Sequence, residues 1–149
     1  MKNAIDEDKV LSKIDELNKY LEELEKIRPL DFDEYRKSIE KKRSCERLLQ
    51  ISVESVIDTC NIIVSNLKLG IPYDEDALFE KLEQNGIISK QMRNKLKDMK
   101  GFRNILVHKY GEVDDEKVFE NLDRLEDFEQ FKEEILNFLR KFENKGEDR

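Results

Sequence analysis

Residues 101–110 hold the only histidine of the chain, five positions after an arginine and two before a tyrosine. Imidazole has an unperturbed pKa close to neutral, which makes His108 the first candidate for acid/base chemistry. Arg103 stays charged and can bind phosphate oxygens through a fork of N–H groups, and Tyr110 supplies a phenolic hydroxyl. Together the three side chains suggest a site for a phosphodiester.

Helical geometry limits how these side chains can meet. At about 100° per residue, Arg103 and His108 are about 140° apart on a regular helix and do not share a face. Asn104 lies four residues before His108, so its amide could hydrogen-bond and orient the imidazole. Convergence of Arg103 and His108 on one phosphate therefore needs a distorted helix end or a second copy of the chain across a two-fold axis. We favour the second copy.

Each candidate also has a purely structural interpretation. His108 can be a capping residue whose imidazolium interacts with the carbonyl end of its helix. Arg103 can pair with an acid of the last helix, and Tyr110 can be a half-buried aromatic at a helix end. Spacing alone does not decide between these interpretations and a catalytic site.

Other chemistries find little support in the sequence. It lacks a glycine-rich phosphate loop, a serine nucleophile elbow and a second histidine, so metal catalysis is disfavoured and no metal site or cofactor is expected. Cys45 and Cys60 would lie about four turns apart on one helix, beyond disulfide reach. We expect both to be small buried hydrophobes in a reducing compartment.

Length and composition predict one folded domain over residues 1–149. The chain is 42% charged and 38% hydrophobic, but its apolar residues recur with helical spacing, unlike those of a disordered chain. No apolar run approaches the roughly 20 residues needed to cross a bilayer, and the N-terminus has no secretory hydrophobic region. We therefore expect a cytoplasmic protein without a membrane partner.

Charge is distributed unevenly along the chain, whose formal net charge is −7. Residues 87–111 contain seven basic residues and one acid, a local net charge of +6, whereas residues 112–134 contain eleven acids and three basic residues, a local −8. The basic segment carries the histidine and would suit an anionic substrate, while the acidic segment would suit a basic partner or solubility. Solvated helix faces are the plainer explanation for either segment.

Apolar residues at three- and four-residue steps indicate amphipathic helices throughout. We expect a first helix over about 8–26 and a second from a cap at Asp31 or Asp33 to Gly70. If continuous, the second helix has about 37 residues and a length of about 55 Å, with a break near Ser44 as the alternative. So long a helix in a small bundle suggests that a partner covers part of it.

The remaining chain predicts a short helix, a helix that carries the motif and a long final helix. These are a helix from a cap at Asp74 to Gly86, a helix from a cap at Ser89 to Gly111 that kinks or restarts at Gly101, and a continuous helix from a cap at Asp114 or Asp115 to about Phe142.

The segment GFRNILVHKYGEVDDEKVFENL resembles the HEPN superfamily, and specifically its HepT branch, whose motif is Arg, four residues, His, any residue, Tyr. Arg103, His108 and Tyr110 fill this motif. The segments VLSKIDELNKYLEELEKI and ERLLQISVESVIDTCNIIV are similar to the first helices of that branch, so the resemblance covers most of the chain.

The resemblance implies an all-α antiparallel helical bundle that forms a two-fold symmetric homodimer and acts on RNA as a metal-independent endoribonuclease. It implies that His108 is the general acid/base for attack by the 2′-hydroxyl, that Arg103 stabilises charge on the phosphate, and that Asn104 orients the site. It also implies a toxin of the type VII HepT/MntA kind, whose minimal nucleotidyltransferase antitoxin adenylylates Tyr110. The added anionic adenylate would block the cleft and oppose the RNA phosphate.

Two other functions stay open at the level of sequence. The first is a non-catalytic adaptor that presents RNA or a nucleotide to a minimal nucleotidyltransferase. The second is a helical dimerisation module in which Arg103, His108 and Tyr110 only stabilise the interface.

Overall fold

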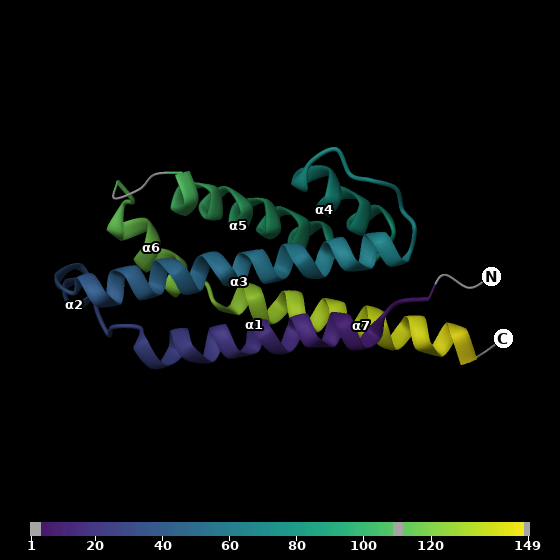
Figure 1. The fold of residues 1–149 in the computed structure, drawn as a ribbon, viewed down its shortest axis with the longest axis horizontal. Coiled ribbons are helices and arrows are strands. Elements are labelled where there is room, and N and C mark those ends of the chain that lie inside the picture. Colours follow the sequence, from purple (N-terminus) through teal and green to yellow (C-terminus); the bar gives the residue numbers. More distant parts are fainter. Residues whose placement is uncertain (1–3, 109–111, 148–149) are drawn as a thin grey trace.

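The computed structural model describes residues 4–108 and 112–147, with side chains described as far as residue 143 (Figure 1). These residues form seven α-helices and no strand, and successive long helices run in opposite directions, which confirms the predicted all-α antiparallel bundle. The helices are α1 (Glu7–Ile27), α2 (Phe32–Lys37), α3 (Ile39–Asn66), α4 (Glu75–Gln84), α5 (Lys90–His108), α6 (Asp115–Leu122) and α7 (Glu126–Glu147).

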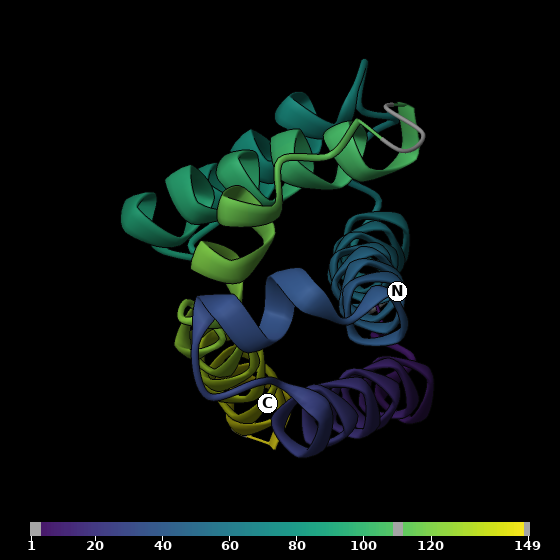
Figure 2. The same ribbon diagram turned by 90° about the vertical axis from the view of Figure 1, so that its left-hand side faces the viewer.

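The central helix is α3, which packs along α1 on one side and against α4 and α5 on the other (Figures 1 and 2). Most of the apolar stripe predicted for the first helix is buried, from Val10 to Leu24, but Leu11, which belongs to the predicted stripe, is 38% exposed. Cys45 and Cys60 are buried, free thiols, as predicted. Burial raises the pKa of the Cys45 thiol to about 11 and also raises the pKa of Cys60. Both cysteines therefore serve as packing residues.

The predicted break in the second helix is real but lies at Ser38, not near Ser44, which is inside α3. Ser38 has an extended backbone, and its Oγ accepts a hydrogen bond from the backbone N–H of Lys41 at 3.2 Å, which caps α3. The break turns α2 so that Tyr35 is buried with its ring 5.8 Å from that of Phe119 in α6.

The prediction of one continuous final helix is wrong, because the chain bends between α6 and α7. The backbone N–H groups of Asp123 and Arg124 bond to carbonyls three residues earlier, each at 3.1 Å, which closes a tight turn. The Asp123 carboxylate also accepts from Nη2 of Arg28 at 2.6 Å. The bend lets α6 contact α2 and α3 while α7 runs beside α1 (Figure 2).

The motif helix is also simpler than predicted. Residues 90–108 form one α-helix, so Gly101 neither kinks nor restarts it. The predicted caps Asp31, Asp74 and Asp114 each accept a backbone hydrogen bond from the first turn of α2, α4 and α6, and Ser89 does the same for α5. The described part of the motif is thus carried on one continuous helix.

By length and mean hydropathy, α3 is the one described helix that could cross a membrane. Glu54 and Asp58 interrupt the apolar sequence of this helix, but the mean hydropathy of its best window still reaches 1.3, which the sequence analysis did not predict. Because 56% of that window is buried within the protein, and the core helix of a soluble protein has the same properties, this is weak support for a membrane segment.

Candidate functional site

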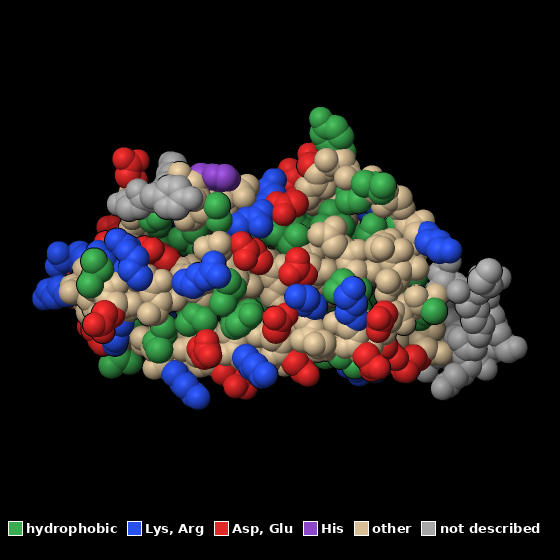
Figure 3. All heavy atoms as spheres, viewed as in Figure 1, with side chains coloured by type: hydrophobic (Ala, Val, Ile, Leu, Met, Phe, Trp, Pro, Cys, Tyr) green, Lys and Arg blue, Asp and Glu red, His purple; other side chains and the backbone are tan. Residues whose placement is uncertain are grey.

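The last two turns of α5 carry the described part of the motif. Arg103 and Asn104 are half-buried, and His108 is the exposed final residue of the helix (purple in Figure 3), in the last turn as predicted. Tyr110 lies outside the described residues, so its role in modification stays a prediction. The chain therefore places one candidate cation inward and the candidate base at the surface.

Arg103 is held at two of its three nitrogens. Its Nη2 donates to Oε1 of Glu75, and its Nε donates to Oδ1 of Asn104 at 3.0 Å. The Arg103 side chain is only 15% exposed. Glu75 belongs to the first turn of α4, so the interpretation in which Arg103 pairs with the last helix is wrong.

The Oδ1 of Asn104 accepts its hydrogen bond from Arg103, whereas its spacing would also have allowed one with the histidine. Within the described residues, no hydrogen bond joins His108 to either of the other two side chains. Because α5 is regular through this segment, the angular separation of about 140° between Arg103 and His108 holds. Arg103 and His108 therefore project from different sides of α5.

The basic segment is less available to an anion than its net charge suggests. Four of its cations are paired with acids of α4 and α7. The pairs are Arg93 with Glu83 at 2.9 Å, Lys95 with Asp127 at 3.2 Å, Lys100 with Asp76 at 2.7 Å, and Arg103 with Glu75.

Lys90 and Lys97 have no ion pair in the part of the chain that is described, and Lys109 lies outside it. Folding thus neutralises most of the local +6, because acids distant in sequence pack onto the same helix. The net charge of the basic segment is therefore weaker support for an anionic substrate than the sequence suggests.

Three consecutive apolar residues next to the motif are only half-buried. Ile105, Leu106 and Val107 point to directions about 100° apart, so together they cover most of the circumference of the helix. None of them is fully buried by the rest of the chain, although Leu106 packs against the core. This end of α5 offers apolar surface beside Arg103 and His108.

Glu75 is the site residue that the sequence analysis missed. It is one of three consecutive acids, 74–76, at a helix start, and acids are common there because they complement the helix dipole. The available signal was the position of these acids shortly before a basic segment. Pairing across two helices depends on tertiary packing, which this signal does not specify.

The described residues contain no group of three or more His, Cys, Asp or Glu side chains that could hold a metal ion. What the arrangement offers instead is a fixed guanidinium and an exposed imidazole on one helix end. These are groups for charge stabilisation and proton transfer at a phosphodiester.

Relatives of known activity match most of the chain. A "tRNA nuclease HepT" of Aphanizomenon flos-aquae is 32% identical over 108 residues, which cover 72% of this chain and 74% of that relative. An "mRNA nuclease HepT" of Shewanella oneidensis is 42% identical over 84 residues, which cover 56% of this chain and 63% of that relative.

Two solved structures and a family model agree with these relatives. A tri-AMPylated Shewanella oneidensis HEPN toxin in complex with MNT antitoxin has a TM-score of 0.79 and 31% identity, over 86% of this chain and 96% of that chain. A toxin–antitoxin crystal structure with AMP-PNP has a TM-score of 0.81 and 30% identity, over 87% and 98%. The family model described as "Ribonuclease HepT-like" matches residues 17–135, and the protein therefore belongs to the HepT-like family.

Proposed function

We propose that this protein is a metal-independent endoribonuclease toxin whose active site joins Arg103 of one copy to His108 of a second copy in a homodimer. The observation that carries the proposal is the filled motif at the end of α5 in a chain whose relatives are named nucleases. The chemistry needs only groups that the described helix end and a second copy of it supply.

The proposed reaction is an internal phosphoryl transfer. The 2′-oxygen of a ribose attacks the adjacent phosphorus, the bond from phosphorus to the 5′-oxygen breaks, and a 2′,3′-cyclic phosphate and a 5′-hydroxyl result. His108 takes the proton of the 2′-hydroxyl, and the imidazolium formed in this way returns that proton to the leaving 5′-oxygen. Arg103 stabilises the charge that develops on the phosphate oxygens.

Two features support a site shared between two copies. Arg103 and His108 lie on different faces of a regular helix, so a two-fold axis is the simplest way to bring them to one phosphate. The half-buried Ile105, Leu106 and Val107 supply apolar surface for such an interface next to the motif.

We further propose that the partner is an MntA-type minimal nucleotidyltransferase antitoxin, which neutralises the toxin by adenylylating Tyr110. The support is the similarity to a tri-AMPylated HEPN toxin in complex with MNT antitoxin. Co-expression with that partner should raise the intact mass by one or more adenylate units, mapped by peptide analysis to Tyr110. A Tyr110→Phe variant should stay unmodified and toxic, whereas modification at another residue would contradict the proposal.

The test of the activity is RNA cleavage in excess EDTA. We expect the wild-type protein to cut RNA and to leave cyclic phosphate ends, and His108→Ala to be inactive while folded. Intact RNA with a folded wild-type dimer would contradict the proposal. If the wild-type protein leaves RNA intact, binds its nucleotidyltransferase partner tightly and does not slow cell growth when expressed alone, it is an adaptor instead.

A further inference from the structure

The contact between Arg103 and Glu75 links the motif to α4. We propose that Glu75 is a positioning residue for Arg103: it holds Nη2 of the guanidinium so that the Nη1 side faces the phosphate. This inference rests on the proposed nuclease function and adds a residue to it. Neither the motif nor its spacing includes Glu75.

The hydrogen bonds of Arg103 occupy one edge of its planar group. The Nε–H and one N–H of Nη2 point along the same edge of a guanidinium, and Asn104 and Glu75 accept from these two nitrogens. Within the described residues, no acceptor lies on Nη1. A planar group held at two nitrogens cannot turn freely, so its remaining N–H groups keep a fixed direction for phosphate oxygens.

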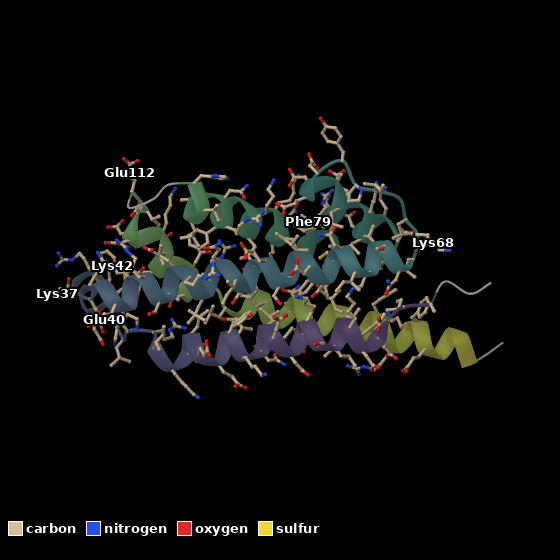
Figure 4. The ribbon with its side chains drawn as sticks, in the orientation of Figure 1. Lys37, Glu40, Lys42, Lys68, Phe79 and Glu112 are labelled. Carbon is tan, nitrogen blue, oxygen red and sulfur yellow. The ribbon has the colours of Figure 1, made fainter. Side chains whose placement is uncertain are left out.

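Glu75 is itself firmly placed. The carboxylate of Asp74 caps α4 by accepting from the backbone N–H of Ala77 at 2.8 Å. Phe79, one turn after Glu75, is fully buried on the side of α4 that faces α3 (Figure 4). The Asp74 cap before Glu75 and the buried Phe79 after it fix the backbone of this first turn. The Glu75 carboxylate can therefore restrict the orientation of the Arg103 guanidinium.

A second ion pair joins α4 to α5 beside the Glu75 pair. Asp76 accepts from Nζ of Lys100 at 2.7 Å, one residue along α4 and three residues back along α5. The two pairs join the same two helices at neighbouring points. Only the Glu75 pair includes a proposed catalytic side chain, which makes Asp76 a matched control.

The expected kinetic signature follows from the charge of Glu75. A carboxylate repels the RNA phosphate, so its removal should not weaken substrate binding, but the freed guanidinium should lose its fixed orientation. We expect Glu75→Ala to lower kcat by about tenfold without raising KM. Glu75→Gln keeps an oxygen of the same reach and should stay within about threefold of wild type, whereas Glu75→Asp, one methylene shorter, should behave like Glu75→Ala.

The experiment compares these three variants with Asp76→Ala in steady-state cleavage of RNA in EDTA, with thermal unfolding measured in parallel. The inference predicts that Asp76→Ala keeps the wild-type kcat even where its Tm falls as much as that of Glu75→Ala. Equal kcat losses in Glu75→Ala and Asp76→Ala would overturn it, as would a wild-type kcat in Glu75→Asp. If Glu75→Ala does not fold, the Glu75→Asp and Glu75→Gln pair decides.

Arg103→Ala and His108→Ala separate the two levels of the proposal. If both are inactive and Glu75→Ala has the wild-type kcat, only the role of Glu75 is wrong. If Arg103→Ala is fully active, the proposed nuclease site is wrong, and the role of Glu75 falls with it. In an inactive Arg103→Ala background, a further change at Glu75 should have no effect on the residual rate.

Discussion

The two halves of α5 are packed in different ways. In the first half, Met92, Leu96 and Met99 are between 0% and 8% exposed and form a stripe against the protein's own core. In the second half, Phe102 is still buried, at 8% exposed, but every residue from Arg103 to Val107 is only half-buried. The first half is completed by its own chain, and we propose that a second copy completes the other.

The ion pairs of the two halves of α5 also differ. Lys95 in the first half forms an ion pair with Asp127, which joins α5 to α7. Arg103 in the second half is bound on one edge of its guanidinium, and we propose that the other edge binds the phosphate. On this proposal, an ion pair stabilises the fold in one half and orients a side chain in the other.

The largest effect should come from His108→Ala, which tests whether the second half is functional. Loss of a general acid/base typically costs about 10²–10⁴-fold in rate, and we expect a loss in that range in RNA cleavage. Because His108 is exposed, thermal unfolding should change little. Asn94→Ala, at an exposed site in the first half, is the control and should cleave at the wild-type rate.

Leucines in the two halves test the difference in packing. Leu96 is 1% exposed, so Leu96→Ala should lower the free energy of unfolding by about 2–5 kcal/mol in denaturant titration. Leu106 is half-buried, so Leu106→Ala should cost less, about 1–2 kcal/mol, and should also raise the dimer dissociation constant measured by sedimentation. Equal stability losses, with dimerisation unchanged, would contradict the proposed division.

The smallest effect should come from Lys95→Ala. Both partners of its pair with Asp127 are partly exposed, and such pairs contribute about 0–1 kcal/mol. We expect a stability loss within that range and an unchanged cleavage rate. A tenfold loss of cleavage would instead extend the functional surface into the first half of α5.

Much of this fold follows from local signals. The apolar stripe of α1 and the caps Asp31, Asp74, Ser89 and Asp114 are set by residues within one or two turns, and these predictions are confirmed. The motif helix is recognisable for the same reason. Features decided within a few residues can be predicted from the sequence.

The errors occur where distant contacts decide. The apolar steps from Leu122 to Leu125 and Phe128 continue as one helix would, and no glycine or proline marks the bend between α6 and α7. The bend is set by packing of α6 against α2 and α3, and by the pair of Asp123 with Arg28. The role of Glu75 was not predicted for the same reason, because its partner Arg103 is 28 residues away in the sequence.

The central claim, that Arg103 and His108 act across two copies of the chain, is tested most directly by mixing two inactive variants. Co-expressed Arg103→Ala and His108→Ala chains form mixed dimers in which one shared site has both residues intact. If half of the dimers are mixed and each has one working site of two, about a quarter of the wild-type cleavage rate should return. A mixture as inactive as either variant alone, with mixed dimers present, would contradict the account.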